Sequence, residues 1–161
     1  MIITIYLVFA MLAVMFFDLT RYLIPNWLTG SLLVLYPLAV FLAPQTVDWQ
    51  AGLLALAVMF AVGYGIFALR LMGGGDVKLI IACALWVGLS QLAEFVILFA
   101  LLGGALSVIL WVGRKALPFL APAFSPPRAL KAGEPVPYGV AIAIAFLWML
   151  WAGKIAAASF F

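Results

Sequence analysis

The sequence predicts an all-α membrane protein, built as a single bundle of about six transmembrane helices. Of its 161 residues, 70% are hydrophobic and only 8% are charged, which leaves too little polar surface to cover a globule in water. Mostly apolar windows also recur at lengths near the ~17–25 residues that a helix needs to cross a bilayer. Residues 1–161 are expected to form one domain, because no mixed polar stretch is long enough to fold as a separate soluble unit.

Six apolar windows follow one another along the chain. The first could be mistaken for a secretory signal, but it has no basic beginning and no small-residue cleavage site, so we interpret it as a true span. The fourth and fifth must be separated by a turn at residues 88–91. The longest connection, about 113–136, contains closely spaced prolines that prevent one continuous helix. The windows cover residues 2–17, 27–43, 51–69, 77–90, 92–112 and 137–157.

The basic residues predict the orientation of these spans. With six spans and an exterior N-terminus, all lysines and arginines except Lys154 fall on the cytoplasmic side. Merging the fourth and fifth windows would move residues 114–131 outside, against the positive-inside rule, so we reject five spans. Being few and next to the membrane, the basic residues favour contact with anionic lipid over nucleic acid. The cytoplasmic set is Arg21, Arg70, Lys78, Arg114, Lys115, Arg128 and Lys131.

The residue types limit the chemistry that the chain can perform. It has no histidine and a single cysteine, Cys83, so it lacks the usual general base, an intrachain disulfide and a zinc-type cysteine cluster. Ionic chemistry must therefore use carboxylates, lysine, arginine or hydroxyl groups.

Two aspartates are expected on the same membrane face, Asp18 at the end of the first window and Asp76 at the start of the fourth. Asp76 could simply cap a helix, and Asp18 could be an interfacial anion beside Arg21. An acid near a helix C-terminus is electrostatically unfavourable, however, which weakens the second explanation. Ionisable residues in spans also mark proton relays and ion paths, so a small transporter or channel stays open beside carboxylate catalysis, as does a purely structural subunit.

Three glycines, 73–75, stand directly before Asp76. They could form a flexible turn, or they could let another helix or an extended substrate strand approach the backbone closely. Irregular backbone at membrane depth is tolerated only where it is buried in protein or lines a wet cavity, and a wet cavity suits carboxylate chemistry.

Three segments resemble the type IV prepilin peptidases, which are intramembrane-type aspartyl proteases. The glycines and Asp76 match the G-x-G-D motif of those proteases, and "GGGDVKL" is similar to the family's second aspartate segment. "DLTRYLIPNWLT" resembles its first aspartate segment, and "VPYGVAIA" at 136–143 resembles its closing segment. Three segments in order are more specific than one glycine motif. The residues that carry the resemblance are Asp18, Pro25, Asn26, Gly73, Gly75, Asp76, Lys78, Pro137, Tyr138 and Gly139.

The resemblance implies an endopeptidase in which Asp18 and Asp76 share a proton around one water. Its substrate would be a prepilin with a short basic leader, cleaved at the cytoplasmic face of the inner membrane, and no metal or organic cofactor would be needed. From the helix dipoles we expect Asp76, near a helix N-terminus, to be the base. Lys78 is explained equally well by positive-inside anchoring.

The chain departs from the larger prepilin peptidases in one respect. Those proteins carry a methyltransferase region with a four-cysteine zinc site, for which this sequence has no counterpart, so we expect no N-methyltransferase activity. The short form resembles the peptidases of Flp or Tad pilus systems most, with archaeal preflagellin peptidases as the alternative. The sequence does not predict the oligomeric state.

Overall fold

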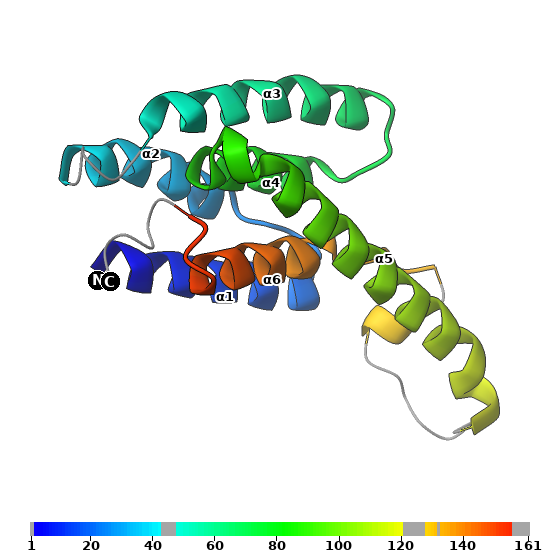
Figure 1. The fold of residues 1–161 in the computed structure, drawn as a ribbon. Coiled ribbons are helices and arrows are strands. Elements are labelled where there is room, and N and C mark those ends of the chain that lie inside the picture. The colour runs from blue at the N-terminus through cyan, green and yellow to red at the C-terminus, as the bar shows by residue number, and fades with distance from the viewer. Residues whose placement is uncertain (1, 43–47, 121–127, 132, 156–161) are drawn as a thin grey trace.

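Six α-helices and one short 3-10 helix make up the computed structural model, which describes residues 2–42, 48–120, 128–131 and 133–155 (Figure 1). The all-α class is thereby confirmed, and each apolar window overlaps one helix. The elements are α1 (Ile2–Arg21), α2 (Asn26–Leu42), α3 (Trp49–Ala68), α4 (Gly74–Val87), α5 (Leu89–Leu120), η1 (Arg128–Leu130) and α6 (Tyr138–Trp151).

Several helices have the dimensions and the surface of membrane spans. Three segments, Ile2–Arg21, Trp49–Ala68 and Leu89–Leu117, are long and apolar enough to cross a bilayer, whereas α2 and α6 are shorter apolar helices. Large apolar side chains cover the outside of α3, where Leu54 and Phe60 are 54% and 59% exposed. Such a surface suits lipid and not water, so this is an integral membrane protein.

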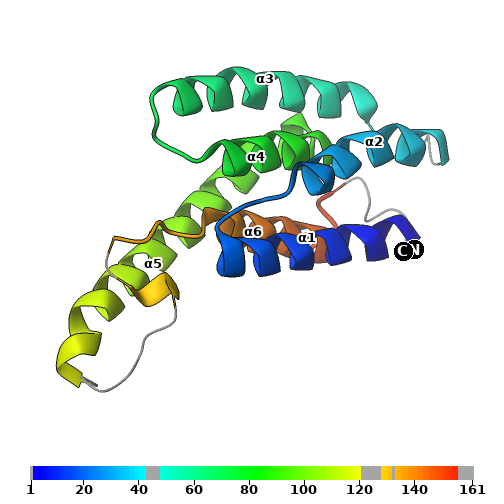
Figure 2. The same ribbon diagram turned by 180° about the vertical axis from the view of Figure 1, so that it is seen from behind.

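Helix α4 lies at the centre of the bundle. It contacts α2, α3, α5 and α6, and nine of its 14 residues are buried. In Figures 1 and 2 it lies between α3 on one side and the neighbouring pair α1 and α6 on the other. The indole Nε1 of Trp86 donates to the carbonyl oxygen of Leu32 at 3.0 Å, and the Trp86 ring meets Tyr36 edge-on at 5.3 Å, which joins α4 to α2.

The expected break between the fourth and fifth windows is confirmed at Gly88, but residues 89–91 of the expected turn already belong to α5. Gly88 has φ of 76°, a left-handed conformation that glycine adopts readily, and its N–H donates to Ala84 O at 3.0 Å. Helix α5 then begins at Leu89 in a new direction.

Helix α5 is longer than we expected, because it continues to Leu120 and not only to residue 112. The window ends where charge begins, but a helix can continue past the apolar layer when its charged residues find partners. Arg114 donates from Nε and Nη2 to Ala129 O, and from Nη2 to Pro135 O, while Lys115 Nζ lies 4.2 Å from the Trp111 ring centroid. The far half of α5 extends away from the bundle, and η1 lies beside it (Figure 2). Residues 121–127 of the expected connection lie outside the described residues.

Candidate active site

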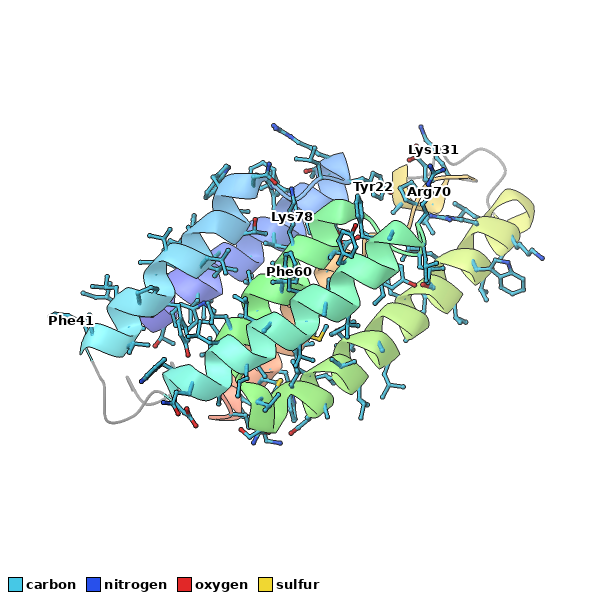
Figure 3. All side chains as sticks on the ribbon, turned by 90° about the horizontal axis from the view of Figure 1, so that it is seen from above. Tyr22, Phe41, Phe60, Arg70, Lys78 and Lys131 are labelled. Atoms are coloured by element: carbon cyan, nitrogen blue, oxygen red, sulfur yellow. The ribbon has the colours of Figure 1, made fainter. Side chains whose placement is uncertain are left out.

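The three segments singled out in the sequence meet at one end of the bundle. Helix α1 ends there, while α4 and α6 begin there. Figure 3 shows Tyr22, Arg70 and Lys131 gathered at this end, and Phe41 at the other end of the helices. Basic side chains thus accompany the two aspartates.

Asp18 is buried in the last turn of α1, with 5% of its surface exposed. Tyr22 ends this helix, since it adopts φ of 51° and its N–H donates to Asp18 O at 3.0 Å. The Asp18 side chain reaches across to α6, where its Oδ2 accepts a hydrogen bond from the Val140 N–H at 3.2 Å. Pro137, the N-cap residue of α6, supplies no side-chain hydrogen bond. The Asp18 carboxylate therefore accepts a hydrogen bond from the first turn of this helix, where the amides have no acceptor within the helix.

Asp76 lies in the first turn of α4 and is partly buried. The N-cap residue of α4 is Gly73 and Asp76 is the third residue of the helix, so the prediction that Asp76 is the N-cap is wrong. Its carboxylate is close enough to Asp18 for the two to interact electrostatically, and the backbone N–H of Gly139 interacts with both. The chain therefore brings the two aspartates together around the start of α6.

Two glycines lie in close contact with the carboxylates. A Cβ at residue 139 would lie 2.8 Å from Asp18 Oδ2, and one at residue 73 would lie 3.0 Å from Asp76 Oδ2. Glycines 73–75 all lack positive φ, and Gly74 and Gly75 belong to α4. At residue 73 these observations favour close approach over a flexible turn as the reason for glycine.

Ile24 joins the three segments, although the sequence had not marked it as a site residue. Its side chain is 6% exposed, and it would contact a Cβ at residue 75 at 3.5 Å and one at residue 139 at 2.9 Å. A buried aliphatic residue between Tyr22 and Pro25 carries no catalytic signal in a sequence, because its role depends on contacts with two distant glycines.

The remaining motif residues support the site from its edges. Lys78 Nζ donates to Asn26 Oδ1 at 3.3 Å, which joins the two aspartate segments. The oxygen of Pro25 accepts from Leu28 N at 3.0 Å and starts α2. The Tyr138 hydroxyl lies 3.2 Å from Ser107 Oγ on α5, and Pro137 is buried.

Two electrostatic interpretations need revision. Arg21 lies over the Phe17 ring, 5.3 Å from its centroid, and is exposed, whereas Asp18 is buried against α6, so a simple interfacial pair does not describe Asp18. Our assignment of Asp76 as the base considered only the helix that carries each residue. The N-terminus of α6 also favours a charge on Asp18, which opposes the effect of the α1 C-terminus.

A hollow opens beside this end of α4. It has a volume of about 640 Å³ and is lined by residues from 67 to 74, including Met72 and Gly73. Met72 also lines an apolar groove of about 520 Å³ between α3, α4 and α5. Among the described residues, no group of three His, Cys, Asp or Glu side chains could hold a metal ion.

Comparison with known proteins identifies the family. The model of the type IV leader peptidase family matches residues 5–108, a range that includes Asp18 and Asp76. Neither the curated proteins nor the solved structures give a significant match. With about two thirds of its length matched, and with both aspartates inside the match, this chain belongs to the type IV leader peptidase family.

Proposed function

We propose that this peptidase is a membrane-embedded aspartyl endopeptidase that removes the short basic leader from Flp-like type IV prepilins at the cytoplasmic face of the inner membrane. The observation that carries the proposal is the meeting of Asp18 and Asp76, from helices far apart in the sequence, around the Gly139 N–H. Membership of a peptidase family favours this function over a transporter or structural role.

The mechanism uses the two carboxylates as a pair that shares one proton. Two like charges in a partly buried site cannot both ionise cheaply, so one carboxyl stays protonated. The ionised carboxylate takes a proton from a water held between the pair, and that water attacks the scissile carbonyl carbon. The protonated partner donates to the carbonyl oxygen, and collapse of the tetrahedral intermediate releases the amine. In such a coupled pair, the role of base belongs to the dyad and not to one fixed residue.

An apolar groove beside α4, lined by Met72 although by neither aspartate, suits the part of the substrate that stays in the bilayer. The hollow at residues 67–74 carries Arg70, whose charge does not favour a basic leader. Cleavage at the boundary between the leader and the membrane segment agrees with the position of both aspartates near helix ends.

The proposed reaction needs only this chain, as a single transmembrane domain without a metal or organic cofactor. It includes no methyl transfer, because no four-cysteine site accompanies the lone Cys83.

Cleavage of a prepilin by carboxamide variants tests the dyad. Asp18→Asn and Asp76→Asn should each lower cleavage by at least about 10²–10⁴-fold, since asparagine preserves size but cannot exchange the proton. The double variant should be scarcely slower than either single variant, because the residues act as one unit. Product mass reports the cleavage, and thermal unfolding in detergent reports the fold.

Glu94→Gln is the matched control, because it removes a carboxylate at the opposite end of the bundle. It should cleave at nearly the wild-type rate. Substantial cleavage by either folded aspartate variant would refute the dyad, and carboxylate-dependent ion flux without a change in substrate mass would favour a transporter.

A further inference from the structure

Arg114, in the far half of α5, holds two segments that lie beyond this helix in the sequence. Its guanidinium donates from Nε and Nη2 to Ala129 O at 3.0 and 2.9 Å, and from Nη2 to Pro135 O at 3.1 Å. Ala129 belongs to η1, and Pro135 belongs to the lead-in segment, residues 133–137, which runs into α6. Because a guanidinium presents its N–H donors in a rigid fork, Arg114 can hold both carbonyl oxygens at once. It thereby fixes the lead-in segment, together with η1, against α5 (Figure 2).

The lead-in segment is stiff, so it transmits this position to the start of α6. Pro135 and Pro137 enclose Val136, and proline fixes its own φ and restricts the backbone of the residue before it. The N–H of Tyr138 donates to Val136 O at 2.9 Å, and the Pro137 side chain is fully buried. A shift of Pro135 would therefore carry the first turn of α6 with it.

That first turn holds the two carboxylates. The Val140 N–H donates to Asp18 Oδ2 at 3.2 Å, and the Gly139 N–H interacts with both Asp18 and Asp76. A Cβ at residue 139 would lie 2.8 Å from Asp18 Oδ2, so the first turn of α6 and this carboxylate are in close contact. Displacement of the start of α6 would therefore change how these amides meet the aspartates.

The same face of α5 also holds Tyr138, the first residue of α6. The Tyr138 hydroxyl lies 3.2 Å from Ser107 Oγ, and a Cβ at residue 103 would lie 2.7 Å from Tyr138 Cε1. The spacing of residues 103, 107 and 114 places all three on one face of the helix. The far half of α5 therefore braces the start of α6 through both Arg114 and Ser107, which gives a reason for its continuation beyond the apolar window.

Positive-inside anchoring is the alternative explanation for Arg114, and a lysine would satisfy it equally well. A lysine ammonium, however, is a compact group without the planar fork of arginine, and it cannot reproduce donation from Nε and Nη2 to two separate carbonyl oxygens. The observed contacts therefore favour a role that requires arginine.

We propose that Arg114 is a positioning residue for the peptidase reaction: by holding η1 and the lead-in segment, it places the Gly139 and Val140 amides against the two aspartates. This role rests on the proposed function, in which the aspartates act as a dyad. Arg114 itself takes no part in the chemistry.

Arg114→Lys, which keeps the charge, and Arg114→Gln, which removes it, test this role in the purified full-length protein. With a prepilin as substrate, each should lower kcat about tenfold and change KM by less than about twofold, because the dyad is misplaced while the substrate still binds. Without substrate, the amides of residues 138–142 should exchange hydrogen at least about tenfold faster, the value of one charge-assisted hydrogen bond, while those of α1 stay protected. Thermal unfolding in detergent sets an assay temperature at which every variant is folded.

Lys115→Gln is the matched control, because it removes the neighbouring charge on α5, whose ammonium contacts the Trp111 ring. It should equal the wild type in kcat and in exchange at residues 138–142. Arg114→Lys with kcat within about twofold of the wild type, or with unchanged exchange at residues 138–142, would overturn the proposal. A uniform rise in exchange through α1 and α4 would also overturn it, because that result marks general destabilisation. A wild type that cleaves no prepilin would instead refute the proposed function, and hydrogen exchange would still test the contacts of Arg114.

Discussion

Replacing Gly139 with alanine is the most direct test of the arrangement around the aspartates. The new methyl group would lie 2.8 Å from Asp18 Oδ2 and 3.0 Å from its Cγ. To move from 2.8 Å to the 3.4 Å at which ordinary van der Waals contact begins, the carboxylate must shift by about 0.6 Å. Ile24 Cδ1, at 2.9 Å from the same methyl group, limits the space for that shift.

A displacement of this size should lower the cleavage rate strongly and the free energy of unfolding only modestly. A 1 Å misplacement of a reacting group can cost about 10²-fold in rate, so we expect kcat/KM for prepilin cleavage to fall by about 10–10²-fold. Overpacking should lower the free energy of unfolding by about 1–3 kcal/mol, which thermal unfolding in detergent can measure.

Gly30→Ala provides the control for this substitution, because a Cβ at residue 30 of α2 would meet nothing within 4 Å. It should retain wild-type cleavage and gain up to about 1 kcal/mol of stability. If Gly139→Ala folds and cleaves within twofold of the wild type, the contact between residue 139 and Asp18 does not position the carboxylate, and our reasoning about the site is wrong.

Three further predictions concern packing, topology and product. Gly52→Ala should lower the free energy of unfolding by about 1–3 kcal/mol, because its Cβ would overlap the Tyr36 hydroxyl, whereas Gly65→Ala on the same helix meets open space and should not; equal unfolding temperatures would contradict this. A reporter fused after Phe161 should be active only if it works outside the cytoplasm, and activity of a cytoplasmic reporter would disprove six spans. Prepilin cleaved by the purified chain should carry a free N-terminal amine, as mass spectrometry can verify, and a methylated product would refute the absence of methyl transfer.

The number and order of the helices could be predicted because they depend on local composition. Each apolar window is long enough to form a helix, and Gly88 supplies the φ of 76° that separates α4 from α5. The end of α5 could not be predicted in the same way, since it depends on hydrogen bonds from Arg114 to two carbonyl groups further along the chain.

The composition of the site was predicted better than its internal contacts. Family resemblance marked both aspartates and the glycines near them, but the hydrogen bond from Val140 to Asp18 joins residues 122 positions apart. Only the packing of α6 against α1 creates it. The Glu94–Lys154 pair could not be predicted for the same reason, because Glu94 lies inside an apolar window and its partner follows the end of α6, 60 residues further along the chain.

The shortness of α4 has a mechanical consequence for the surrounding membrane. With 14 residues, this helix is about 21 Å long, whereas the hydrocarbon layer is ~30 Å thick. Either the bilayer thins around the centre of the protein or the ends of α4 remain recessed beneath its surfaces. Acyl-chain length would then set how deep the start of α4 lies and how far a peptide bond must descend to reach it. The thickness of the host membrane thereby becomes a physical variable of the reaction, even though no lipid takes part in the chemistry.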